Sequence, residues 1–197
     1  MKHTTALAIL ILALLFSGAA FAHHHDGEHQ AQQPNPVEQT DDDRAFNDFL
    51  RAIDVLWNRP QLEARWPDAM DRLIQAAEDT TADTFVRRRA LSILGQFHED
   101  PSRDALLGLT ADEKERVRAL AFYTLGRHFL NRDADRVFAH LEASFRAESL
   151  DVQADIVRAL GFTADPRARA LLQDVLDNRD EEVLQREAAL SLERSHR

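Results

Sequence analysis

VRRRALSILG at residues 86–95 has three later counterparts in the chain, namely VRALAFYTLG at 117–126, VQADIVRALG at 152–161 and LQREAALSLE at 184–193. Their first residues are 31, 35 and 32 positions apart. In each segment the first, fifth, sixth and ninth residues are apolar, which draws one apolar stripe along a helix. A period of this length is typical of stacked helical units that bury their apolar faces against one another.

A shorter amphipathic stretch precedes each of these segments. The sequence therefore predicts an all-α fold, a right-handed α-solenoid of about four helical pairs that occupies residues 67–197 and has no strand. Pro67, Pro101 and Pro166 are expected in the first turn of a helix, where a missing N–H costs nothing. The apolar pairs of the preceding stretches are Leu73 and Ile74, Leu106 and Leu107, Phe138 and Leu141, and Leu171 and Leu172.

Residues 41–66 are expected to form an N-terminal capping helix region. Thr40 followed by Asp43 resembles a capping box. Apolar residues then recur at helical spacing from Phe46 to Trp57, so we expect one helix that Asn58-Arg59-Pro60 ends.

These residues resemble the HEAT-repeat family, particularly the short bacterial type first noted in bilin lyases. The resemblance rests on Asp-Pro pairs at turns, on Val-Arg pairs that open second helices, and on closing Leu-Gly pairs. The sequence departs from the family pattern at Gln153 and Gln185. Arg87 and Arg118 are expected to serve structure by bridging turns between units. Tetratricopeptide repeats have a similar period, but their Trp, Tyr and Pro pattern does not recur. The residues that carry the resemblance are Asp100-Pro101, Asp165-Pro166, Val86-Arg87, Val117-Arg118, Leu94-Gly95, Leu125-Gly126 and Leu160-Gly161.

Residues 1–22 read as a cleavable signal peptide, with Lys2 before an apolar run and a small-residue site at Ala20-Phe21-Ala22. An uncleaved anchor is the alternative, but the chain has no Cys for a lipoprotein anchor. We therefore expect a periplasmic or secreted protein without a membrane association after cleavage. Residues 23–40, rich in His and Gln, are expected to be a disordered tail.

Cleavage after Ala22 would expose His23-His24-His25 at the new N-terminus. The α-amine, two amide nitrogens and a third-position imidazole can bind copper or nickel in a square plane, and His29 lies nearby. The alternative is a solvated tail with only weak affinity for zinc or nickel. This pattern suggests a metal carrier or sensor as the second functional hypothesis.

The formal net charge of −10 argues against nucleic-acid binding. In a solenoid the second helices line the concave side, and the third, seventh and eleventh positions of the four segments would face it. These positions are rich in Arg and aromatic residues, which suits a protein partner or an acidic peptide; ordinary surface placement of Arg is the alternative. The expected partner-binding residues are Arg88, Tyr123, Arg127, Arg158, Phe162 and Arg186.

No catalytic motif is recognisable, so we expect no enzyme and no cofactor beyond the N-terminal copper or nickel. His98-Glu99 is similar to the paired iron ligands of HEAT-like deoxyhypusine hydroxylases, yet it occurs once and after a helix end. We instead expect His98 and His128 to act as cations at helix C-termini. The leading hypothesis is a non-catalytic interaction module, and an enzyme ranks third. The sequence leaves the oligomeric state open.

Overall fold

A computed structural model describes residues 40–195, which form helices without a strand among them. The expected signal peptide, nearly all of the expected tail, and the candidate metal ligands His23, His24, His25 and His29 lie outside the described residues. The helices are α1 (Asp41–Arg51), α2 (Arg59–Arg65), α3 (Ala69–Glu78), α4 (Thr84–Leu94), α5 (Asp100–Leu109), α6 (Glu115–Phe129), α7 (Ala134–Phe145), α8 (Leu150–Leu160), α9 (Pro166–Asn178) and α10 (Glu182–Arg194).

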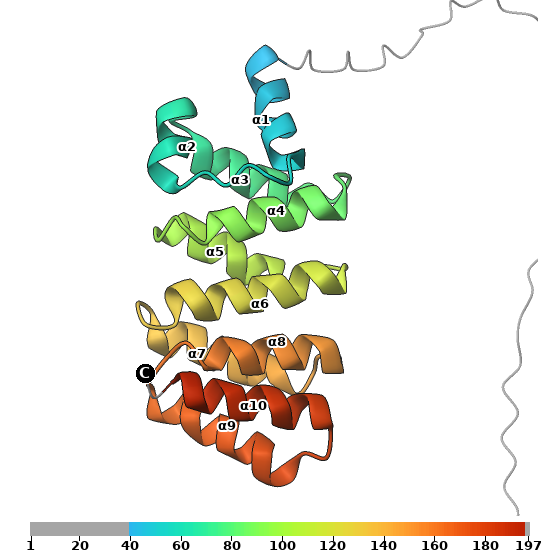
Figure 1. Cartoon of the computed structure of the whole chain (residues 1–197), viewed down its shortest axis with the longest axis vertical. Coiled ribbons are helices and arrows are strands. Elements are labelled where there is room, and N and C mark those ends of the chain that lie inside the picture. Colours follow the sequence, from blue (N-terminus) through green and yellow to red (C-terminus); the bar gives the residue numbers. More distant parts are fainter. Residues whose placement is uncertain (1–39, 196–197) are drawn as a thin grey trace, which may run out of the picture. The chain divides into compact units, whose positions relative to one another are not determined.

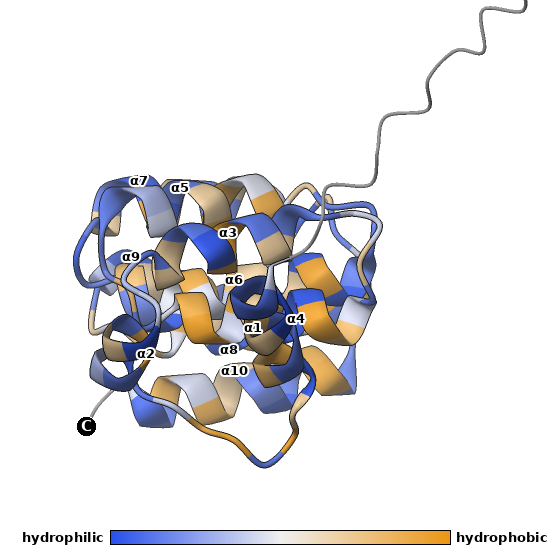
Figure 2. Cartoon of the chain, turned by 90° about the horizontal axis from the view of Figure 1, so that it is seen from above, coloured by the Kyte–Doolittle hydropathy of each residue, from blue (hydrophilic) through white to orange (hydrophobic). Residues whose placement is uncertain are grey.

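Helices α3 to α10 form four consecutive pairs, which confirms the expected α-solenoid (Figure 1). The second helices α4, α6, α8 and α10 contact one another in that order. Seen from above, they lie in one layer and the first helices α3, α5 and α7 in another (Figure 2). None of the helices between Thr40 and Ser195 combines the length and apolar character needed to cross a lipid bilayer.

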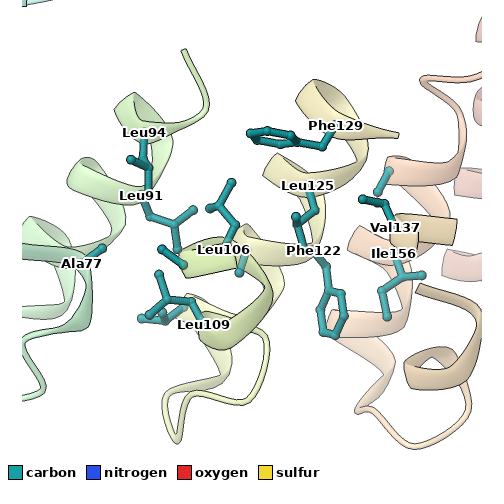
Figure 3. Close-up of a cluster of buried hydrophobic side chains, with 14 of the residues drawn as sticks. Ala77, Leu91, Leu94, Leu106, Leu109, Phe122, Leu125, Phe129, Val137 and Ile156 are labelled. Carbon is teal, nitrogen blue, oxygen red and sulfur yellow. The ribbon is translucent and has the colours of Figure 1, made fainter. Parts of the chain in front are cut away.

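The apolar stripes found in the sequence form the core between the two layers. Phe122 and Leu125 of α6 point toward neighbouring units and are almost fully buried, as are Leu91 of α4 and Leu106 of α5 (Figure 3). Burial of side chains of this size contributes about 1.5 to 3 kcal/mol each. Because a unit buries its stripe against the next unit as well as its own partner helix, the units stabilise one another.

Glycine permits close contact between successive second helices. In the quoted segments the tenth residue faces the eighth residue of the following segment. A Cβ atom added at Gly95 would lie 2.8 Å from Thr124 Cγ2. One added at Gly126 would lie 2.4 Å from Ala159 Cβ, and one at Gly161 would lie 2.7 Å from Ser191 Cβ. Non-bonded carbon atoms do not approach one another this closely. The contacts between successive second helices, which we call the joints between units, therefore require glycine. Gly126 does not end its helix as expected, because α6 continues to Phe129.

Ion pairs bridge the same joints on the side of the turns. The Arg87 side chain, 2% exposed, pairs with Asp112 of the next unit, and Arg118 pairs with Glu148 at 3.2 Å. This arrangement confirms the bridging role expected for both arginines. At the third joint Gln153 accepts a hydrogen bond of 3.1 Å from Arg179, so the guanidinium comes from the following unit instead.

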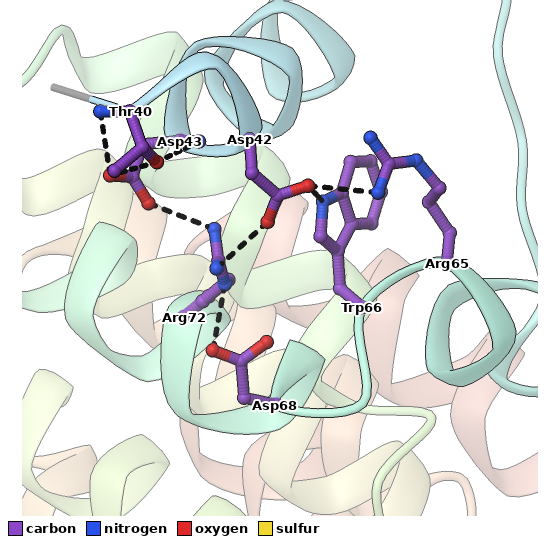
Figure 4. A network of polar contacts seen from close by, with 7 residues as sticks. All are labelled: Thr40, Asp42, Asp43, Arg65, Trp66, Asp68 and Arg72. Carbon is purple, nitrogen blue, oxygen red and sulfur yellow. Dashed lines mark hydrogen bonds and ion pairs between the residues drawn. The ribbon is translucent and has the colours of Figure 1, made fainter.

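The N-terminal region begins with the expected capping box, in which the Thr40 hydroxyl accepts from the Asp43 N–H at 3.1 Å. Polar contacts then fix α1 on the following helices (Figure 4). Asp42 accepts hydrogen bonds from Arg65 at 2.8 Å and from the Trp66 indole at 3.2 Å. Arg72 of α3 pairs with Asp42 at 2.9 Å. These contacts make α1 part of the same packed body as the repeats.

The expectation of one helix from Phe46 to Trp57 is wrong. Helix α1 ends at Arg51, and Asn58 instead caps the new helix α2. Trp57 stacks on Phe49, with ring centroids 5.1 Å apart. A continuous helix would place residues eight apart at about 12 Å along its axis, so this stacking requires a loop at 52–58.

Pro67 is also not in a first helical turn. It lies in the turn before α3, which begins at Ala69 after its cap Asp68. Pro101 and Pro166 do occupy the first turns of α5 and α9, as expected.

Candidate functional site

The second helices carry a hollow of about 630 Å³. Three of the expected partner-binding residues line it, namely Arg88 of α4, Tyr123 of α6 and Arg158 of α8. The helical spacing therefore brought together residues from three units. The other lining residues are Glu115, Arg116, Ala119, Leu120, Asp151, Ala154, Asp155 and Val183.

Phe162 and Arg127, also expected at the site, continue this surface beyond Tyr123. The Tyr123 and Phe162 rings meet edge to face with centroids 5.4 Å apart. Arg127 donates a hydrogen bond of 3.1 Å to the Tyr123 hydroxyl and lies 5.8 Å from the Phe162 centroid. Arg194 of α10 lies 4.8 Å from the same centroid. Two guanidinium groups thus converge on one aromatic ring.

Arg158 departs from the expected Arg-rich surface. It pairs with Asp155 on its own helix and with Glu187 of α10 at 2.8 Å, so its charge is neutralised within the protein. Burial raises the pKa of Asp155, although the nearby Arg158 opposes this shift. Asp155 and Glu187 follow the third position of their segments by one residue, and the expected column of third, seventh and eleventh positions therefore missed them.

Arg186 lies on α10 but does not line the hollow. Its side chain is 65% exposed and pairs with Glu182 at 2.9 Å on the same helix. The hollow is centred on α6 and α8, and only Val183 of α10 reaches it.

Arginines differ between the two layers in their partners. One arginine in each first helix forms ion pairs with carboxylates. By contrast, five arginines of the second helices have no carboxylate at ion-pair distance among residues 40–195. One of them, Arg89, donates to the Val55 carbonyl instead, and the other four are Arg88, Arg116, Arg127 and Arg194. The paired arginines are Arg72, Arg103, Arg136 and Arg167.

Exposed apolar side chains show the same asymmetry. The large exposed apolar residues of the described chain lie on second helices or in the loop 52–58, and none lies on α3, α5, α7 or α9. They are Phe85, Leu150, Val183 and Leu190 on the helices, with Ile53 and Leu56 in the loop. One face therefore combines unpaired cations with apolar contacts, which is typical of a protein-binding surface.

His98 and His128 are neighbours, with ring centroids 5.7 Å apart. Burial, together with the adjacent Arg127, lowers the pKa of His128 to about 4. Burial and Arg132 also lower the pKa of His98. His128 is therefore neutral at pH 7, which contradicts the expectation that it acts as a cation at a helix end, and the pKa of His98 shifts in the same direction. Between Thr40 and Ser195 no group of three His, Asp or Glu is arranged to hold a metal ion.

Paired helices in two layers, joined by a recurring glycine contact and an ion-pair ladder, define an α-solenoid repeat protein. Residues 70–154 match the family of HEAT repeats, and residues 152–178 match the PBS lyase HEAT-like repeat. The chain belongs to the HEAT-repeat family. HEAT repeats generally mediate protein–protein interaction and are typically non-enzymatic scaffolds. No curated protein matches the chain.

Proposed function

We propose that this chain is a non-catalytic interaction module whose second-helix face, formed by α4, α6, α8 and α10, binds an acidic segment of a protein partner. The observation that carries the proposal is the concentration of unpaired arginines and exposed apolar side chains on that one face. The apolar run and small-residue site within residues 1–22 support action in the periplasm or outside the cell.

Arginine suits this task because its planar guanidinium binds a carboxylate through two parallel hydrogen bonds. Arg127 and Arg194 lie against the Phe162 ring, which restrains both side chains before binding. Arg88 and Arg116 lie at the hollow, whose lining includes the half-buried Tyr123. An acidic side chain of the partner can therefore pair with Arg127 and Arg194, or with Arg88 and Arg116, while the next residue of the partner enters the hollow.

The hollow itself has a mixed charge, because Glu115, Asp151 and Asp155 line it together with three arginines. Arg158 is already paired inside this set. The preference for an acidic partner consequently rests on Arg88, Arg116, Arg127 and Arg194. It will weaken as salt concentration rises, because exposed charges are screened.

A charge-reversal experiment tests this function. The double variant R88E/R127E removes two guanidinium groups without breaking an ion pair. The control R136E/R146E makes the same change in charge on α7 and the residue after it, and it breaks only the exposed pair of Arg136 with Asp104. Binding of a labelled polyglutamate peptide is followed by fluorescence anisotropy. We expect R88E/R127E to lose roughly tenfold or more in affinity, about 1.4 kcal/mol, and the control to change by less than about threefold.

Arg158 is unsuitable for this test. An R158E substitution would place a third carboxylate beside Asp155 and Glu187, so lost binding could reflect altered packing of α8 on α10. Equal affinity of the native protein and R88E/R127E, with both melting at the same temperature, would show that the second-helix face does not bind acidic segments.

A further inference from the structure

The loop 52–58 between α1 and α2 is fixed to α4. The Arg89 guanidinium donates to the Val55 carbonyl, and the Gln96 side-chain amide donates to the Trp57 carbonyl at 3.3 Å. Gln96 also accepts from the Arg59 N–H at 2.9 Å. The Trp57 ring contacts the rings of Phe49 and Trp66, with centroid distances of 5.1 and 5.4 Å. The backbone is thus held at its middle and at its end.

Two residues of this loop take no part in that packing. The exposed fraction is 74% for Ile53 and 85% for Leu56, whereas Val55 and Trp57 are half-buried against the core. Exposed aliphatic side chains gain stability only when another molecule covers them. Because the loop is already fixed, such a molecule would bind it without paying to order its backbone.

The loop lies on the same face as the hollow. Arg89, which holds the loop, is the neighbour of Arg88, which lines the hollow. Figure 2 shows the apolar loop beyond α1 and α4, on the side of the second helices and opposite α3, α5 and α7. A segment that occupies the hollow and extends over α4 toward α1 therefore meets Ile53 and Leu56.

We propose that the loop 52–58 is a second docking element, in which Ile53 and Leu56 hold an apolar side chain of the same protein segment that places its acidic residues against the arginines. This inference rests on the proposed function. It adds that the bound segment of the partner carries acidic residues along its length and an apolar residue at the end of the segment that lies nearest α1.

A protein segment fits this loop better than a membrane. Asp54 lies between the two aliphatic residues and is exposed, so insertion of the loop would carry a carboxylate into the bilayer. The chain also has a formal net charge of −10, which repels an anionic lipid surface. A protein segment can instead leave Asp54 in water while it covers Ile53 and Leu56.

Selection from a random peptide display library tests the inference with the full chain. Three proteins are used as targets: the native protein, the variant I53S/L56S, and the conservative variant I53V/L56M. The native protein and I53V/L56M are expected to enrich acidic peptides that also carry a large apolar residue. I53S/L56S is expected to enrich acidic peptides without it. A peptide selected on the native protein should lose roughly tenfold in affinity for I53S/L56S.

Acidic peptides without an apolar preference on the native protein would overturn this inference and leave the proposed function intact. Enrichment of peptides without acidic residues would overturn both. Flotation of the native protein with phosphatidylcholine vesicles, lost in I53S/L56S, would assign the loop to a membrane and also overturn the inference. Because both side chains are exposed, melting temperatures of all three proteins should agree within about 2 °C.

Discussion

Gly126 of α6 lies so close to Ala159 of α8 that a Cβ atom on the glycine would fall 2.4 Å from the Ala159 Cβ and 2.8 Å from its Cα. Substitution of Gly126 by alanine must push the two helices apart, because the obstructing atoms include backbone. We expect G126A to lower the free energy of unfolding by about 1 to 3 kcal/mol, measured by urea denaturation.

Gly108 of α5 provides the matched control for this substitution. A Cβ atom there meets nothing within 4 Å. Alanine is favoured over glycine within helices, so G108A should raise the free energy of unfolding by up to about 1 kcal/mol. Equal stability of G126A and the native protein would contradict the close contact between α6 and α8.

The buried ion pair of Arg87 and Asp112 should be essential to the joint between the first two units. Their side chains are 2% and 7% exposed. Asp112→Ala leaves the Arg87 guanidinium buried with only the Ala77 carbonyl as acceptor, and should cost about 3 to 5 kcal/mol in unfolding free energy. The exposed pair of Arg136 and Asp104 is the control, since Arg136→Ala should cost less than about 1 kcal/mol. Comparable losses in both variants would refute the bridging role.

His128 should make stability sensitive to acid. Its pKa is about 4 in the folded protein against an ordinary value of 6.5, chiefly because it is buried. The unfolded chain therefore takes up this proton first as pH falls. The stabilising contribution is complete above about pH 6.5 and decreases as pH falls toward 4. The loss in melting temperature between pH 7.5 and pH 5 should be smaller in His128→Gln than in the native protein.

His140 should also contribute to the loss of melting temperature at low pH, and its contribution remains in the His128→Gln variant. Burial lowers its pKa too, and its ring accepts or donates a hydrogen bond of 2.7 Å with Thr110. Part of the acid sensitivity will consequently remain in His128→Gln. A pH dependence identical to that of the native protein would show that His128 is not protonated selectively in the unfolded chain.

The His-rich segment leads to a separate prediction about metal. If cleavage falls after Ala22, one equivalent of Cu(II) should produce a visible absorption band, and replacement of His25 by alanine should abolish it. Mass spectrometry of the mature N-terminus establishes the cleavage site. An N-terminus other than His23, or no stoichiometric band with His23 first, would remove this hypothesis.

The repeat architecture could be predicted because each unit repeats the same apolar spacing. Each quoted segment lies on one of the four second helices, with Gly95 and Gly161 as the C-caps of α4 and α8, and Arg87 and Arg118 bridge the expected turns. The loop 52–58 could not be predicted in the same way. Its apolar residues keep a helical spacing, yet aromatic stacking of Trp57 on Phe49 outweighs the continuation of α1.

The sequence indicates which residues of the candidate site share a face, but it does not indicate which of its arginines are already paired with a carboxylate of the protein. Spacing alone predicts that Arg88, Tyr123 and Arg158 share one face, and in the structure these three residues line one hollow. Whether an arginine is available depends on its three-dimensional neighbours. Arg158 is neutralised by Glu187 from the next unit, whereas Arg194 lies on Phe162, and neither contact follows from the spacing within one segment.

The glycine contacts also distinguish the ends of the repeat array from its middle. Ile93 of α4 stands where the later second helices have Thr124, Ala159 or Ser191, and Glu193 of α10 stands where the earlier ones have glycine. A duplicated unit with glycine at one position and a small residue at the other would fit between existing units. It would not fit after α10. An added unit of this kind is therefore accommodated in the interior of the array, where it would leave the contacts at both ends unchanged.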